Sequence, residues 1–168
     1  MNSSESSVTP SALAGTVLNR LEKVAELVDE SDPDILPFFE EEAVGELLKI
    51  ETFLGAWHEQ GAGCPCPLAD FRMRWHTLKG AANSVGQLRI GTLAGGMKEL
   101  LDILNSLQAA VLRQELTKVT VTVMEAIKDL LTEAHAPQYN HARKEQIQKA
   151  AEAIMVLRQK VALAQTTS

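Results

Sequence analysis

Apolar residues recur every three or four positions along most of the chain, which is the spacing of one buried face of an α-helix. The clearest stripe of this kind consists of Phe71, Trp75, Leu78, Ala82 and Val85. Stretches of this type predict six helices, with approximate bounds at residues 11–28, 33–59, 68–87, 89–107, 117–134 and 140–164. Thr117 is expected to cap the fifth of these helices.

Proline and glycine cluster between these stretches and do not recur at the spacing of strands and turns. The main breaks are Asp32-Pro33, the segment 61–67 and Ala136-Pro137. The fold is therefore predicted to be all-α: an antiparallel four-helix bundle with additional N- and C-terminal helices. We expect a disordered N-terminus over residues 1–10, the helical bundle over 11–135 and the C-terminal helix over 136–168.

Composition and charge narrow the class of function. The 168 residues are 45% hydrophobic, enough to bury one sizeable core. A net charge of −6 argues against nucleic-acid binding, which usually requires a basic face. No uncharged apolar stretch approaches the ~18 residues of a membrane span, and residues 1–7 lack the pattern of a signal peptide. A cytoplasmic protein without membrane partners is expected. Cys64 and Cys66 are too few for a metal site.

The predicted helix 68–87 also has a polar side, which suggests chemistry. The residues on this side, again three or four apart, are Arg72, His76, Lys79, Gly80, Asn83 and Gln87. A mid-helix glycine costs about 1 kcal/mol relative to alanine, so Gly80 calls for an explanation. It would leave an open approach to the imidazole of His76, a good nucleophile when neutral. Lys79 places a cation where a phosphoryl group on His76 would lie.

Each of these residues also has a simpler interpretation. A single histidine or lysine on a helix is usually only a surface residue, and a glycine in mid-helix is often a packing contact. Gly95-Gly96 in the next predicted helix is assigned to close helix packing for the same reason. His58, His135 and His141 have no Lys-Gly neighbour and are expected to be surface or helix-end residues. The combination at His76, beside a clean apolar stripe, favours function there.

The stretch from His76 to Gly86 resembles the signature of histidine-containing phosphotransfer (HPt) domains. That signature is His-x-x-Lys-Gly with a second glycine ten residues after the histidine, and it matches His76, Lys79, Gly80 and Gly86. The segment Phe38-Phe39-Glu40-Glu41-Glu42-Ala43 is similar to the helix that precedes the phosphorylated one. The resemblance covers about residues 34–135 and is greatest to the N-terminal module of chemotaxis-type and twitching-motility-type kinases.

The resemblance implies a phosphocarrier with no ATP-binding domain of its own, and not a self-sufficient enzyme. His76 would accept the phosphoryl group, Lys79 would stabilise it and Gly80 would keep the approach open. Arg72, Gly80, Asn83 and Gln87 are the candidate partner-binding residues. The partners implied are a response-regulator receiver domain, which would supply the Mg²⁺, and a histidine kinase as phosphodonor, in trans or in the same polypeptide. No metal or other cofactor is expected on this chain.

One position departs from the family pattern. Chemotaxis-type modules usually carry a glutamate on the following helix that hydrogen-bonds the histidine to be phosphorylated. The matching position here is Lys98, with Glu99 one residue later, so either the alignment slips by one residue or His76 lacks a carboxylate partner. This departure supports an alternative, a non-catalytic scaffolding bundle with a degenerate site. A hydrolytic enzyme ranks last, because the polar side offers no second acid or base.

Overall fold

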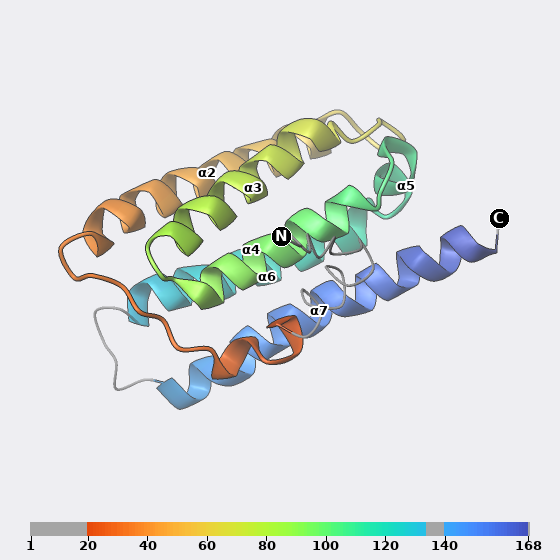
Figure 1. The fold of residues 1–168 in the computed structure, drawn as a ribbon. Coiled ribbons are helices and arrows are strands. Elements are labelled where there is room, and N and C mark those ends of the chain that lie inside the picture. Colours follow the sequence, from red (N-terminus) through yellow and green to blue (C-terminus); the bar gives the residue numbers. More distant parts are fainter. Residues whose placement is uncertain (1–19, 134–139, 168) are drawn as a thin grey trace, which may run out of the picture.

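The protein is entirely helical over the residues that its computed structural model describes, which are 20–133 and 140–167. Figure 1 shows the arrangement, and the all-α prediction is confirmed. The elements in chain order are the 3₁₀ turn η1 (Val24–Glu26) and the α-helices α2 (Leu36–Glu59), α3 (Leu68–Ser84), α4 (Leu88–Asp102), α5 (Ser106–Val111), α6 (Arg113–Glu133) and α7 (Asn140–Thr166).

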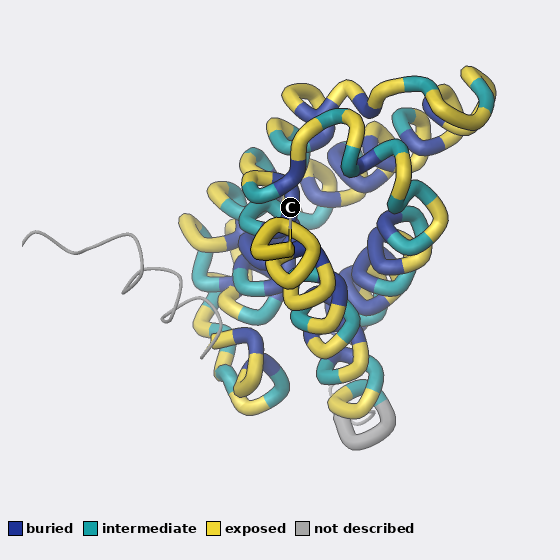
Figure 2. The backbone as a smooth tube through the Cα atoms, turned by 90° about the vertical axis from the view of Figure 1, so that its right-hand side faces the viewer, coloured by how far each residue is buried: buried dark blue, intermediate teal, exposed yellow. Residues whose placement is uncertain are grey.

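Four long helices, α2, α3, α4 and α6, form the central bundle. Each contacts the next, and α2 also touches α6, so the four enclose one core. α7 and η1 pack on the other side of α4, and α7 also runs along α6, as Figure 1 shows. The apolar stripe predicted for α3 is correct: Phe71, Trp75, Leu78 and Ala82 are all 0% exposed. In Figure 2 the buried positions line the inner sides of the helices.

The helix boundaries differ from the predicted ones between α4 and α6. α4 ends at Asp102, not near residue 107. Asn105 starts the short helix α5 through a capping box with Gln108, in which each side chain accepts a hydrogen bond from the other's backbone N–H. α6 then begins at Arg113, so Thr117 lies inside the helix and the cap predicted there is wrong. Asn105 followed three residues later by Gln108 is the sequence signal of such a box, and it marks this helix start without any proline or glycine.

The connection between α3 and α4 is a tight turn built on Gly86. Gly86 has φ +77°, a left-handed conformation that glycine adopts without steric cost. Its carbonyl accepts a hydrogen bond from the backbone N–H of Glu30. An added Cβ at Gly86 would lie only 2.0 Å from the Glu30 carbonyl oxygen. This turn therefore joins α3 and α4 to the chain segment that precedes α2.

That preceding segment covers the far side of α4. Residues 20–22 are helical and η1 follows, with Leu21 and Val24 fully buried. The predicted helix 11–28 is thus confirmed only around residues 20–22, since 11–19 lie outside the described residues. The predicted disorder of residues 1–10 and the break at Pro137 also lie outside them.

Several apolar side chains of α2 that the sequence pattern included lie on the surface instead. Phe38, Val44 and Leu48 are 74%, 56% and 61% exposed, while Phe39, Leu47 and Ile50 on the same helix are buried. A single helix can turn only one side toward a bundle, so an apolar pattern wider than that side leaves residues exposed. In the described part of the chain, no helix combines the length and hydrophobicity needed to cross a membrane.

Candidate functional site

His76 lies in the middle of α3, on the side facing solvent. The preceding residue, Trp75, is fully buried and fixes the rotation of the helix, which places His76 about 100° away at the surface. Within residues 20–133 and 140–167, no hydrogen bond or ion pair involves the imidazole. Both ring nitrogens are therefore available to react or to bind.

Gly80 leaves the surface next to His76 flat. A Cβ added there would meet no heavy atom within 4 Å, so the glycine is not needed for packing in the fold. Packing was the simpler interpretation of this residue, and the structure excludes it for contacts among the described residues. The remaining helix-destabilising cost of about 1 kcal/mol has no structural compensation within the chain. Contact with a visiting molecule is an explanation consistent with this geometry.

Lys79 is positioned by the neighbouring helix. Its aliphatic stem lies over Gly95 of α4, where an added Cβ would be 3.5 Å from Cδ and 3.6 Å from Cε. The absence of a side chain at Gly95 thus lets the partly buried stem of Lys79 pack on the α4 backbone. The ammonium group of Lys79 makes no hydrogen bond or ion pair in the described chain. The adjacent Gly96 packs on the other side of α4, against Leu21 and Ile154. The assignment of Gly95-Gly96 to helix packing is correct for Gly96, and Gly95 packs against the Lys79 stem.

Arg72 is tied to the C-terminal end of α4. Its Nε lies 2.9 Å from Oδ1 of Asp102, and its Nη2 donates a hydrogen bond to the carbonyl of Leu101. These contacts bridge α3 and α4, so the guanidinium has a structural role in holding the two helices together. The two contacts leave other N–H donors of Arg72 without a described acceptor, and its binding of a partner stays a prediction.

The contacts between α3 and α4 also show which residue lies opposite His76. Arg72 meets Asp102, and Lys79 meets Gly95. The helices are antiparallel and rise equally per residue, so each step forward on α3 corresponds to one step back on α4. His76 is therefore level with Lys98. Glu99, one residue further along α4, points about 100° away from Lys98 around the helix axis.

Lys98 is held by a carboxylate of its own helix. Its Nζ lies 2.8 Å from Oδ2 of Asp102, the residue that also pairs with Arg72. The Lys98 side chain is 26% exposed, so its ammonium group lies at the edge of the surface that carries His76. The residue level with the imidazole is thus a cation.

Asn83 and Gln87 have different environments. Asn83 is exposed at the end of α3, with Oδ1 directly over the backbone of Gly91, where a Cβ would be 2.0 Å away. Gln87 lies beyond α3, which ends at Ser84 and not at residue 87 as predicted. Its side-chain amide donates to Ser31 Oγ and the residue is 7% exposed. Gln87 is therefore part of the turn and not available to a partner, contrary to the sequence-based expectation.

In comparisons with known proteins, no family model, curated protein or solved structure matches this chain. The interpretation of His76 rests on the residues and their geometry.

Other groups with reactive potential do not form a competing site in the described chain. No cluster of three or more histidine, cysteine, aspartate or glutamate residues there could hold a metal ion. Burial raises the pKa of the Cys66 thiol to about 11, so it stays protonated at neutral pH and is a poor nucleophile. His58 shares a hydrogen bond with Thr117 Oγ1. His135 and the side chain of His141 lie outside the described residues.

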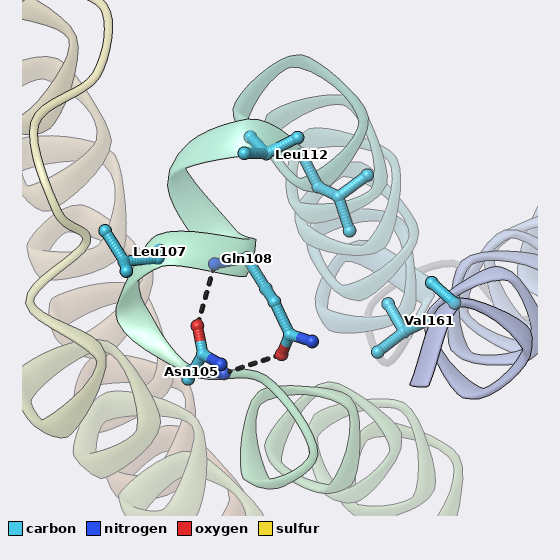
Figure 3. A pocket seen from close by; sticks show the side chains of 7 residues that line it. Asn105, Leu107, Gln108, Leu112 and Val161 are labelled. Carbon is cyan, nitrogen blue, oxygen red and sulfur yellow. Dashed lines mark hydrogen bonds between the residues drawn. The ribbon is translucent and has the colours of Figure 1, made fainter. Parts of the chain in front are cut away.

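Several hollows lie on the surface of the described residues. One lies between α5 and α7, with a volume of about 310 Å³, and Leu107, Leu112 and Val161 line it together with the capping box of Asn105 and Gln108 (Figure 3). The side-chain oxygens of Asn105 and Gln108 each accept a hydrogen bond from the other residue's backbone N–H, so both are engaged in helix capping. Nothing in this hollow can perform acid–base or nucleophilic chemistry. A second hollow, between α2 and α6, does carry titratable groups, among them His58, Glu51 and Lys128, but His58 has no Lys-Gly pair one turn away as His76 has.

Gly80→Ala is expected to separate fold from function. Alanine should raise the free energy of unfolding by about 1 kcal/mol, because it favours helix and meets no neighbour. The same methyl group beside His76 should slow phosphoryl transfer from a protein donor roughly tenfold, since small misplacements of reacting groups are costly. Chemical denaturation and transfer kinetics measure the two effects.

Gly55→Ala is the matched control, since Gly55 is also exposed in mid-helix and also has no neighbour within 4 Å of an added Cβ. It should show the stabilisation alone. Unchanged transfer in Gly80→Ala would contradict the role assigned to the open surface.

Proposed function

We propose that this protein is a histidine phosphotransfer module that receives a phosphoryl group on His76 and passes it to or from an aspartate of a response-regulator receiver domain. The observation that carries the proposal is the exposed imidazole of His76, unpaired among the described residues, with a cation, Lys79, and the open surface of Gly80 one turn away. The resemblance to HPt domains at the same residues points in the same direction.

Phosphoryl transfer requires from this chain mainly that the imidazole of His76 and the ammonium group of Lys79 are correctly placed. The unprotonated Nε2 of His76 attacks the phosphorus of an aspartyl phosphate; the P–O bond to the aspartate breaks, its carboxylate leaves with the electron pair, and the P–N bond forms. The proton on Nδ1 remains on the ring or passes to water. Lys79 is placed to hydrogen-bond the phosphoryl oxygens, a charge-assisted contact. The receiver supplies the Mg²⁺ and most of the catalytic groups.

A protein partner suits this surface better than a small substrate. Met73, three residues before His76, is 55% exposed on the same side of α3, so the imidazole is flanked by an apolar contact point and the bare backbone of Gly80. Flexible methionine side chains are common at surfaces that bind other proteins. His76 does not line any of the larger hollows found among the described residues. The donor is therefore a separate kinase domain, and we place the protein with its partners in the cytoplasm.

A scaffolding bundle with a degenerate site is the second candidate. The observation in its favour is Lys98, which puts a cation level with His76 where the family has a hydrogen-bonding carboxylate. In this case the imidazole would take no phosphoryl group, and binding of partners would not depend on it.

Labelling decides between the two candidates. The protein is incubated with a ³²P-phosphorylated receiver domain or an active histidine kinase, and the label is tested for the acid-labile, alkali-stable behaviour of phosphohistidine. Peptide mapping should place it on His76 and not on His58. Absence of any such label from donors that phosphorylate another HPt protein would favour the scaffold.

Lys79→Ala is expected to slow transfer without unfolding the domain. Loss of a charge-assisted hydrogen bond costs about 1.5–3 kcal/mol, which corresponds to a decrease of roughly 10- to 100-fold. The stem is only partly buried, and its contact is with Gly95 of α4, so the thermal midpoint should fall only slightly. Rapid-quench measurement of label transfer, with circular dichroism as the check on the fold, tests this. A wild-type rate would remove Lys79 from the mechanism.

A further inference from the structure

The residue level with His76 raises a question that the proposed function leaves open, because a cation there must affect a phosphorylated histidine. A phosphoryl group adds a charge of about −1.5 to −2 at neutral pH. Two lysines then face it from different helices, Lys79 from α3 and Lys98 from α4. A carboxylate at position 98 would repel the phosphoryl group, whereas an ammonium group attracts it.

We propose that Lys98 is a second cationic ligand of the phosphoryl group on His76, held in place by Asp102, and that it shifts the equilibrium toward phosphohistidine. The inference rests on the proposed function and deepens it. It concerns how long the group stays on this module relative to its partner, and not whether His76 reacts.

The geometry that supports this inference begins with the two contacts that bracket His76. Arg72 with Asp102 lies one turn before it, and Lys79 with Gly95 lies one turn after it. Between these two contacts, His76 of α3 and Lys98 of α4 are at the same level along the helix pair. The 2.8 Å ion pair from Lys98 to Asp102 holds the ammonium group near the α3–α4 boundary.

The charges around this point favour an anion. The only carboxylate that the described contacts place at this boundary is Asp102, and it is shared between Lys98 and Arg72. Together with the unpaired Lys79, three cations thus face one carboxylate. The group is short of negative charge, and a phosphoryl group on His76 would supply it. Arg20 adds a further cation near Lys79, because the two residues line the same small hollow together with Asn83.

Lys98 would bind Asp102 and the phosphoryl group at the same time. Its ammonium group has three donors, of which Asp102 occupies one, so it can reach toward a phosphoryl oxygen without releasing the carboxylate. Asp102 is thus a positioning residue. The unphosphorylated protein already holds the Lys98 side chain in this position. Less side-chain entropy is therefore lost when His76 is phosphorylated.

The test uses a small donor so that partner docking plays no part. Phosphoramidate transfers its phosphoryl group to Nε2 of His76, with breakage of its own P–N bond and release of ammonia. At fixed concentrations of phosphoramidate and ammonia, ³¹P NMR measures the ratio of phosphorylated to free His76. Lys98→Gln should lower this ratio about tenfold, Lys98→Glu should lower it further, and Lys98→Arg should stay near wild type. The difference should shrink in 1 M salt, because exposed charges are screened.

Lys160→Gln is the matched control. Lys160 is also an exposed lysine paired with a carboxylate, Glu115, but lies between α6 and α7, away from His76. It should leave the ratio unchanged. Equal ratios in Lys98→Gln and Lys160→Gln, with wild-type His76 labelled, would overturn the role of Lys98 alone. Failure of both phosphoramidate and protein donors to label wild-type His76 would instead overturn the proposed function, and the inference with it.

Discussion

His76→Gln is expected to lose all acid-labile label while the protein remains folded. Glutamine keeps a polar side chain of similar reach but has no nucleophilic nitrogen, so no phosphoramidate bond can form. The imidazole is exposed and makes no hydrogen bond within the described chain, so its removal should change the free energy of unfolding by no more than about 0.5 kcal/mol. Few single substitutions combine complete loss of chemistry with so small an expected effect on the fold.

The experiment measures the incorporation of label from a phosphorylated receiver. Thermal unfolding of the same preparation shows whether the protein is folded. His58→Gln is the control, because His58 is the other histidine whose side chain the structure describes, and it is also exposed. It should retain full labelling. Residual label in His76→Gln with the same acid lability would show that another histidine is the acceptor. Undiminished binding of the receiver by His76→Gln would be compatible with either function, since docking uses the surrounding surface.

Gly86→Ala is expected to cause the largest loss of stability of any change discussed. A residue with a Cβ pays about 1–2 kcal/mol for the left-handed conformation, which Gly86 adopts at φ +77°. The new Cβ would also lie 2.0 Å from the carbonyl oxygen of Glu30, so the backbone must move and the hydrogen bond from Glu30 to Gly86 would be lost. Together these effects should reduce the free energy of unfolding by about 3 kcal/mol or more.

Urea denaturation and the thermal midpoint measure this loss, and a midpoint lower by roughly 10 °C is expected for a chain of this length. Gly63→Ala separates the two causes. Gly63 has φ +87° but no atom within 4 Å of an added Cβ, so only the conformational cost applies there. Gly86→Ala should therefore destabilise the protein clearly more than Gly63→Ala. Equal effects would mean that the contact with Glu30 contributes nothing to the turn.

The second glycine of the HPt-like signature thus has a structural explanation in this chain. Gly86 does not lie beside His76. It closes the turn that sets α4 against α3, and the register between these helices in turn brings Lys98 level with the imidazole and Gly95 under the stem of Lys79. Gly80 and Gly86 therefore serve different purposes: one leaves a surface open, and the other makes a turn possible.

Much of the candidate site followed from the sequence, because the periodicity of one helix is a local property. The stripe of Phe71, Trp75 and Leu78 determined which side of α3 is buried, and hence that His76 is exposed and that Lys79 and Gly80 lie one turn away. These relations depend only on 3.6 residues per turn and on the burial of apolar side chains.

The tertiary structure alone decided what the neighbouring helix brings to this surface. Arg72 is engaged by Asp102, and Gln87 is buried against Ser31, although both share the polar spacing of His76. A helical pattern cannot show such outcomes, because they depend on where α3 ends and on the register with α4. That register is set by the Gly86 turn and its contact with Glu30, 56 positions earlier in the chain, and a contact between segments so far apart leaves no periodic signal in the sequence.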